Sequence, residues 1–284
     1  MPAKRLIDTV DPNTLDRISA LWDALADFDA AQAYESGVFL LEGVCALIDA
    51  WDASWVVAVR LERDNCEDPL NGWRPRAIRR LSHAPERNLM ARRQTAELEA
   101  GRPDQTTIAN VDGAGRYRVN LLRDLAPAGW FEGDYYRTFY QAAGHRDAIW
   151  AGVPINEDTE AYFGFYRGVD QRCFSTVETS IVDYALRGLR WFLRQQVLFE
   201  GIAVAASPLT RSERSVLQGL LQGRSEQEIA ETLGHSPHTT HEYVKKLFRK
   251  FGVNSRSALM ALWLGRIPPD QGTVGRITPT LKPH

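Results

Sequence analysis

The sequence predicts an α+β protein of two domains: an N-terminal antiparallel sheet flanked by helices, and a C-terminal all-α domain of four short helices. Three observations lead to this prediction. Alternating apolar residues in the first part are typical of strands buried on one face. Residues 209–264 instead repeat apolar residues at helical spacing, interrupted by glycines. A chain of 284 residues also exceeds the common size of one domain. We place the parts at residues 1–200, 201–208 (a linker), 209–266 and 267–284 (a flexible tail).

Two helices and a strand are expected at the start of the chain. Apolar residues from Leu15 to Leu25 recur at helical spacing, and this helix should end near Phe28. A second helix is expected from about Tyr34 to Trp51. From Trp55 to Leu61 apolar residues alternate with their neighbours, which predicts a strand buried on one face.

The next predicted strand, Trp73 to Leu81, is rich in arginine. Its four arginines are Arg74, Arg76, Arg79 and Arg80. They could bind an anionic effector. The preferred interpretation is a charged strand face that protects a sheet edge from pairing with another chain.

The remaining elements of the predicted sheet follow in order. A helix is expected at Pro85–Ala100. A hairpin should follow, with strands Thr107–Val111 and Arg116–Leu122 joined by Asp112-Gly113-Ala114-Gly115. Two late strands, Ala148–Ile155 and Ala161–Arg167, should be joined by a turn at Asn156-Glu157-Asp158. Together they predict about five or six short, mostly antiparallel strands with helices on the faces.

The densest aromatic segment of the chain runs from Trp130 to Tyr140. It is a candidate wall for a pocket that binds a small apolar or aromatic ligand, through Trp130, Tyr135, Tyr136 and Phe139. Core packing is the preferred alternative, because aromatic residues at helical spacing usually belong to a core.

A long helix is expected from Phe174 to Phe199. Ser175 and Glu178 stand three residues apart, which is the spacing of a capping box. The helix is apolar on more than one side, so one side is left over after packing on the sheet. A second copy of the chain is the simplest partner for that side, with Leu189, Trp191 and Leu198 as candidate dimer contacts.

Residues 209–264 contain four short helical patterns, at Ser212–Leu221, Glu226–Leu233, Pro237–Phe251 and Ser255–Leu264. Gly234 suits the end of the second helix, since glycine tolerates positive φ. Ser236 and Pro237 suit the start of the third, as a cap and as a first helical residue. One helix that ends just before another begins is what a helix-turn-helix motif requires.

The third of these helices has a buried stripe and a cationic face. A cationic helix face can read base edges in the major groove and neutralise phosphates, although many such faces are only solvated. The candidate DNA contacts here and just beyond are His238, Thr239, His241, Glu242, Lys245, Lys246, Arg249 and Arg256.

From Leu209 to Leu259 the chain resembles the LuxR/GerE class of bacterial helix-turn-helix transcription regulators. The resemblance is carried by Leu209-Thr210, Glu213, Gly223, Glu228-Ile229-Ala230, Ser236-Pro237-His238-Thr239-Thr240, Lys250-Phe251-Gly252-Val253 and Arg256. Two residues depart from the family pattern: Thr240 stands where valine is usual, and Tyr243 where histidine is usual. The resemblance implies that His241, Glu242 and Lys245 face base edges, and that Thr239, Lys246, Arg249 and Arg256 face phosphates.

The same resemblance implies a dimer on DNA. In that family the last helix pairs two DNA-binding domains, which gives Leu259, Leu262 and Trp263 a dimerisation role on a partly palindromic operator. Residues 144–174 resemble, more loosely, a late part of the GAF/PAS-like sensor domains that precede this motif in many regulators. The resemblance therefore implies a sensor domain in residues 1–200.

Charge and cysteine content agree with this organisation. From Ser207 onward the chain has 11 Lys and Arg against 6 Asp and Glu, a net charge of +5, while residues 1–206 have 23 against 30, a net charge of −7. The basic part is the one expected to meet phosphates. Three cysteines without metal-site spacing, Cys45, Cys66 and Cys173, favour a reducing compartment. No hydrophobic signal core or membrane span is recognised, so a cytoplasmic location without membrane contact is expected.

No catalytic constellation, metal motif or cofactor fingerprint is found in the sequence. The predicted function is that of a dimeric regulator which binds double-stranded DNA and senses a signal through its N-terminal domain. An alternative is a regulator whose N-terminal domain docks a protein partner and binds no small molecule. An enzyme fused to a DNA-binding module is the third possibility, and the missing catalytic set disfavours it.

Overall fold

The computed structural model describes residues 10–61, 67–81, 85–202 and 209–263. The described residues fall into two compact units. The first lies within Met1–Asp27 and Glu35–Leu193, and the second within Phe28–Tyr34 and Arg194–His284. The predicted tail at 267–284 and the candidate cysteine Cys66 lie outside the described residues, as does most of the linker at 201–208.

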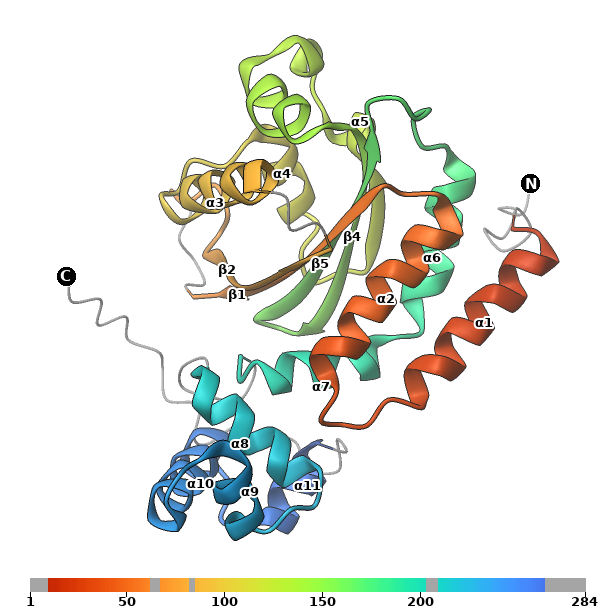
Figure 1. Ribbon diagram of the computed structural model, residues 1–284. Helices are drawn as coiled ribbons and strands as arrows, with labels where there is room; N and C mark the ends of the chain where they lie inside the picture. Colours follow the sequence, from red (N-terminus) through yellow and green to blue (C-terminus); the bar gives the residue numbers. More distant parts are fainter. Residues whose placement is uncertain (1–9, 62–66, 82–84, 203–208, 264–284) are drawn as a thin grey trace. The chain divides into compact units, whose positions relative to one another are not determined.

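An antiparallel sheet of five strands forms the centre of the first unit (Figure 1). The strands are β1 (Asp52–Arg60), β2 (Trp73–Arg80), β3 (Arg118–Leu121), β4 (His145–Asn156) and β5 (Thr159–Gly168), in the spatial order β2-β1-β5-β4-β3. The strands predicted at 55–61, 73–81, 116–122, 148–155 and 161–167 are confirmed. The arginine-rich β2 is an edge strand among them, as its charge predicted.

Helices cover both faces of the sheet (Figure 1). Helices α2 (Ala33–Ile48) and α6 (Thr176–Arg187) lie on one face, with α1 (Pro12–Ala26) outside them. Helices α3 (Pro85–Glu99) and α4 (Gln105–Val111) lie on the other. The short elements α5 (Leu122–Leu125), η2 (Trp130–Glu132), η3 (Tyr136–Tyr140) and η4 (Gln141–Ala143) connect β3 to β4.

Packing is tight on the face that α1, α2 and α6 cover. The Trp55 and Phe163 rings stack with their centroids 5.8 Å apart. Trp22 of α1 donates its indole N–H to the carbonyl of Ala185 in α6, at 2.9 Å. Gly43 of α2 faces Leu21, and a Cβ at this position would stand 2.5 Å from that side chain. The close approach of α1 to α2 therefore depends on this glycine.

Two predicted elements, one strand and one long helix, differ from the structure. Thr107–Val111 is not a hairpin strand but part of α4. The carboxylate of Asp104 accepts the backbone N–H of Thr106 at 2.9 Å and caps the helix. The cap lies before the segment that was interpreted as a strand, and a short apolar run alone does not separate the two structures.

The predicted helix from Phe174 to Phe199 is in fact two helices. Helix α6 ends at Arg187, and α7 (Arg190–Phe199) begins after Gly188 and Leu189. Glycine is less favourable than alanine in a helix interior by about 1 kcal/mol, so little stability is lost when the helix ends at Gly188. The residues of α7 up to Leu193 belong to the first unit, and those from Arg194 belong to the second.

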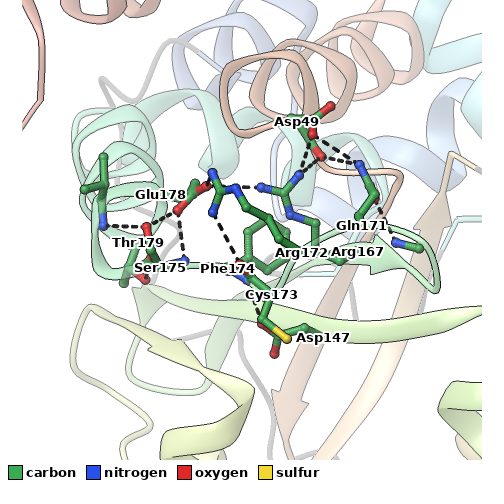
Figure 2. Close-up of polar contacts among 12 residues, drawn as sticks. Asp49, Asp147, Arg167, Gln171, Arg172, Cys173, Phe174, Ser175, Glu178 and Thr179 are labelled. Atoms are coloured by element: carbon green, nitrogen blue, oxygen red, sulfur yellow. Dashed lines mark hydrogen bonds and ion pairs between the residues drawn. The ribbon is translucent and has the colours of Figure 1, made fainter.

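A buried arginine holds α2, β5 and α6 together at one end of the sheet (Figure 2). The side chain of Arg167 is only 1% exposed. It donates to the Asp49 carboxylate at 2.7 Å and to the Glu178 carboxylate at 3.1 Å, and its guanidinium lies over the Phe174 ring. Arg172 donates to the same Glu178 carboxylate. This arginine cluster closes the end of the sheet.

The second unit consists of α8 (Arg211–Leu221), α9 (Glu226–Leu233), α10 (Pro237–Phe251) and α11 (Arg256–Trp263), together with the end of α7 and residues 28–34. The bounds of the four helices lie within one residue of the predicted ones. Leu259, Leu262 and Trp263 are at most 5% exposed and share one core with Leu198 and Phe199. The chain itself covers these three side chains, and their predicted role in dimerisation stays a prediction.

The Glu178 carboxylate makes the stability of the first unit depend on pH. Burial raises the pKa of this carboxyl, but hydrogen bonds from Ser175 and Arg172 outweigh it and hold the pKa at about 2, below the ordinary 4.5. The stabilisation is thus fully present above pH 4.5 and is lost as the pH falls toward 2. We expect Glu178→Gln to lower the free energy of unfolding at pH 7 by up to about 3 kcal/mol and to flatten its decline between these pH values.

Urea unfolding at a series of pH values, followed by Trp fluorescence, measures this effect. Seven of the eight Trp residues precede residue 194, so the signal reports mainly on the first unit. Asp16→Asn removes an exposed carboxylate on α1 and serves as the control, with little change expected. An unchanged pH dependence in Glu178→Gln would mean that the cluster does not stabilise the fold through this charge.

Candidate functional site

The turn between α9 and α10 is fixed by local hydrogen bonds. Ser225 and Glu228 form a capping box at the start of α9. Gly234 ends α9 with φ of 66°, a left-handed conformation that favours glycine. The Ser236 hydroxyl then accepts the backbone N–H of Thr239 at 3.0 Å, and Pro237 occupies the first turn of α10. The helix-turn-helix geometry is therefore encoded by residues adjacent in sequence.

Helix α10 has one buried stripe and one exposed cationic face. Thr240, Val244, Leu247 and Phe251 are buried. The candidate DNA contacts on the opposite face are exposed to solvent, apart from a half-buried Glu242: His238, Thr239, His241, Glu242, Lys245, Lys246 and Arg249. The two faces that the sequence predicted are thus separated in the structure.

The charged groups on this face make only exposed contacts. Lys245 donates to the Glu242 carboxylate at 3.0 Å, and His241 Nδ1 lies 2.9 Å from the Glu226 carboxylate of α9. Lys246 lies over the Tyr243 ring, with 5.5 Å from its nitrogen to the ring centroid. Exposed ion pairs contribute about 0–1 kcal/mol, so these cations can exchange their partners for phosphates or bases at little cost.

Arg256 differs from the other candidates. Its guanidinium donates to the backbone carbonyl of Arg224 at 2.7 Å and to that of Leu220 at 2.5 Å. Leu220 lies in the last turn of α8 and Arg224 in the loop that follows it, so both bonds join Arg256 to the end of α8. Arg256 thus holds α11 against α8, and the phosphate contact expected of it stays a prediction.

The two departures from the family pattern have different surroundings. Thr240 is fully buried, and its hydroxyl has no hydrogen-bond partner. Tyr243 is half-buried and stacks against His235, with ring centroids 5.6 Å apart. The threonine therefore carries an unsatisfied polar group into the core of the second unit, whereas the tyrosine covers its edge.

The first unit contains a cavity of about 190 Å³ between the sheet and helices α3 and α4. Its walls come from β1, β2, β4 and β5 on one side, and from α3, α4 and the η3–η4 segment on the other. One part is apolar, with Val56, Ile78, Met90 and Phe139. The other part is polar, with Ser54, Arg80, His145 and Tyr166. A mixed lining of this kind suits a small amphipathic molecule.

Only one of the four predicted ligand residues lines this cavity. Phe139 does, whereas Trp130, Tyr135 and Tyr136 belong to a neighbouring aromatic cluster. Trp130 donates its indole N–H to Asp104 at 2.9 Å, and Tyr135 accepts from Gln94 of α3 at 2.8 Å. Tyr140, the last residue of the predicted segment, also lines the cavity, whereas sequence reasoning missed Trp150, Tyr162 and Tyr166 of the late strands. Tyr162 and Tyr166 stand four residues apart in the predicted strand and so share one of its faces, which was the available signal.

Three further findings bear on other kinds of site. Burial, together with Asp52 and Glu42, raises the pKa of the Cys45 thiol to about 12, so this cysteine stays protonated within the core. No three His, Cys, Asp or Glu residues in the described parts of the chain are grouped as metal ligands would be. Among the described helices, none has the length and apolar character required to cross a membrane.

Comparisons with known proteins identify the second unit. Residues 207–263 match the family model described as bacterial regulatory proteins, luxR family. The chain is 35% identical over 78 residues to the transcriptional regulatory protein MctR of Rhizobium johnstonii, covering 28% of this chain and 34% of that protein. It is 37% identical over 73 residues to the nitrate/nitrite response regulator protein NarP of Escherichia coli, covering 26% and 34%. The chain thus spans about a third of the length of these curated relatives.

Among solved structures, the VqsR LBD domain of Pseudomonas aeruginosa aligns with 14% identity and a TM-score of 0.44, covering 67% of this chain and 99% of that one. The match of residues 207–263 to the luxR family confirms the resemblance for this part of the chain, in which α9 and α10 form the helix-turn-helix. The matched relatives are transcription regulators and not enzymes.

The buried hydroxyl of Thr240 gives a test of packing in this module. We expect Thr240→Val to raise the local stability of α8–α11 by about 1 kcal/mol, because it removes an unsatisfied polar group at nearly constant shape. Amide hydrogen exchange of these helices in the full chain measures the change. The control is Thr239→Val, one residue earlier, where the hydroxyl is exposed and bonded to Ser236 at 2.8 Å. A gain in the control, or a loss at Thr240, would contradict this account.

Proposed function

We propose that the protein is a sequence-specific, dimeric transcription regulator whose first unit senses a small molecule. The observation that carries the proposal is the exposed cationic face of α10 in a module that matches the luxR family. A helix of this width enters the major groove, where side chains read base edges and lysines neutralise phosphates. On this proposal, the protein acts in the cytoplasm, where the DNA that it binds is found.

The roles of the α10 residues follow from their positions. His241, Glu242 and Lys245 extend from the middle of the exposed face and contact base edges in this proposal. Thr239, Lys246 and Arg249, with His238 at the helix start, contact the sugar–phosphate backbone. Arg256 supports them indirectly, since it holds α11 and α8 together behind the recognition helix.

A homodimer on a partly palindromic operator remains part of the proposal, with a different contact set. Leu189 and Leu198 are buried within one chain, as are Leu259, Leu262 and Trp263. Trp191 at the start of α7 is 48% exposed, and an exposed aromatic side chain of this size is a common anchor of a protein interface. We therefore assign the dimer contact to Trp191.

The cavity favours a ligand over the alternative of a docked protein partner. A protein that serves only as a docking surface needs no internal space, and native cores are close-packed. A cavity of about 190 Å³ with both polar and apolar walls is a feature of small-molecule sites. The five-stranded sheet with helices on both faces also fits the GAF/PAS-like sensor type, which we retain as a proposal.

The division between base and phosphate contacts can be tested at two residues of α10. We expect Lys245→Ala to cost about 1–3 kcal/mol on the preferred DNA site and to relax its sequence. Arg249→Ala should weaken binding to specific and random duplexes alike. It should also reduce the salt dependence of the affinity by the amount expected for about one lost phosphate contact. Fluorescence anisotropy on an operator selected from random sequences, at several salt concentrations, measures both. If Lys245→Ala lowers the affinity for both duplexes equally, the proposed base contact of Lys245 is wrong.

The dimer contact can be tested by sedimentation equilibrium. We expect Trp191→Glu to weaken self-association about thirtyfold or more, since buried aromatic anchors contribute about 2 kcal/mol or more. Val169→Glu changes another exposed apolar residue, 54% exposed in the turn after β5, and should leave association unchanged. A dimer that survives Trp191→Glu would place the interface elsewhere.

A further inference from the structure

Arg80, the last residue of the edge strand β2, is an unpaired charge on the wall of the cavity. Within the described parts of the chain its side chain makes no hydrogen bond and no ion pair. Burial lowers the pKa of its guanidinium, although Tyr166 and Asp52 counteract this. A partly buried cation without a partner is costly, so it requires a reason outside the fold.

The other arginines of the same strand each have a structural partner. Arg74 pairs with Asp68 at 3.0 Å, and Arg76 pairs with Glu99 at 3.1 Å. Arg79 points to the opposite face of the sheet, where it lies 4.7 Å from the Trp55 ring centroid. Protection of the sheet edge therefore accounts for Arg74 and Arg76, but it does not explain Arg80.

Further polar groups surround Arg80 at this end of the cavity. Ser54 is its partner in the register of β1 with β2, and the Ser54 hydroxyl lies 3.1 Å from the Tyr166 hydroxyl. His145 stacks on Tyr166 with ring centroids 4.2 Å apart, and its Nε2 is buried without a hydrogen-bond partner. Hydroxyl and imidazole groups can all donate to an anion.

The charges at this end leave an excess of one cation. Asp52 lies 3.6 Å from the guanidinium of Arg87 and 3.5 Å from His145 Nε2. Its negative charge pairs with Arg87 and acts on Arg80 only from beyond ion-pair distance, so the two arginines share one carboxylate. An anion that enters here gains both an ion pair and hydrogen bonds in a site partly shielded from water.

The rest of the cavity limits the ligand to a small apolar body. Val56, Ile78, Met90 and Phe139 provide apolar walls. An apolar cavity of roughly 150 Å³ can hold benzene, so about 190 Å³ holds a ring or a short chain with one polar group. The polar group then meets Arg80 when the apolar body lies against α3.

We propose that the cavity binds a small monocarboxylic acid, with the carboxylate on Arg80 and the Ser54–Tyr166 hydroxyl pair, and with the apolar body against Ile78, Met90 and Phe139. This inference rests on the proposed ligand-sensing function and specifies the chemistry of its ligand. The Arg80 guanidinium is the group that selects an acid over a neutral molecule of the same shape, because only an anion neutralises it.

Isothermal titration of the full chain with matched acids and amides tests this. The probes are acetate, hexanoate, octanoate, benzoate and phenylacetate, each compared with its own amide. We expect at least one acid to bind at least tenfold more tightly than its amide. Arg80→Met should remove this preference and leave the amide unaffected, while Arg76→Met, on the same strand but outside the cavity lining, should retain it. Tyr166→Phe keeps the ring and should weaken acid binding severalfold.

The outcomes separate the two proposals. If no acid binds more tightly than its amide, or if the preference survives Arg80→Met, the carboxylate inference is wrong. If acids and amides bind equally, the proposal of ligand sensing stands, and the proposal that the ligand is an anion is wrong. DNA binding is measured in the separate anisotropy experiment, so a failure there leaves the acid preference unaffected, and the converse also holds.

Discussion

The buried guanidinium of Arg167 is the interaction on which the first unit most depends. One side chain joins the end of α2 through Asp49 and the start of α6 through Glu178. A buried arginine loses several kcal/mol of hydration, and only well-placed carboxylates offset that loss. Asp49 adopts a left-handed backbone with φ of 53° where it meets the arginine. The helices on this face are therefore positioned by charge as well as by apolar packing.

A tightly held face on one side of the sheet makes the cavity on the other side possible. In β1 and β5 the Trp55 and Phe163 rings stack on each other, whereas the alternate residues Ser54, Gly164 and Tyr166 line the cavity. A Cβ at Gly164 would lie 2.4 Å from the Tyr166 hydroxyl, so the glycine provides the space in which that hydroxyl reaches Ser54. The alternation of a pleated strand thus separates a structural core from a polar site within a single sheet.

Sequence reasoning succeeded where the signals are local. The caps at Ser225 and Ser236 and the glycine at Gly234 mark the ends of α9 and α10, so the helix-turn-helix bounds could be predicted almost to the residue. It failed where a structure depends on distant partners. Residues 107–111 were mistaken for a strand, and the break at Gly188 was missed. The cavity joins α3 to strands 50 to 80 residues further along, and no spacing rule reveals such a pairing.

The contrast between Arg167 and Arg80 shows why net charge is a poor guide to what a domain binds. Residues 1–206 carry a net charge of −7, which alone would disfavour an anionic ligand. Yet charge acts over short distances at a site partly shielded from water, since solvent screens most surface carboxylates from it. Arg167 is matched by two carboxylates within 3.1 Å, whereas Arg80 faces open space beside hydroxyl groups. The same residue type therefore stabilises the fold in one place and, unmatched, defines a ligand preference in the other.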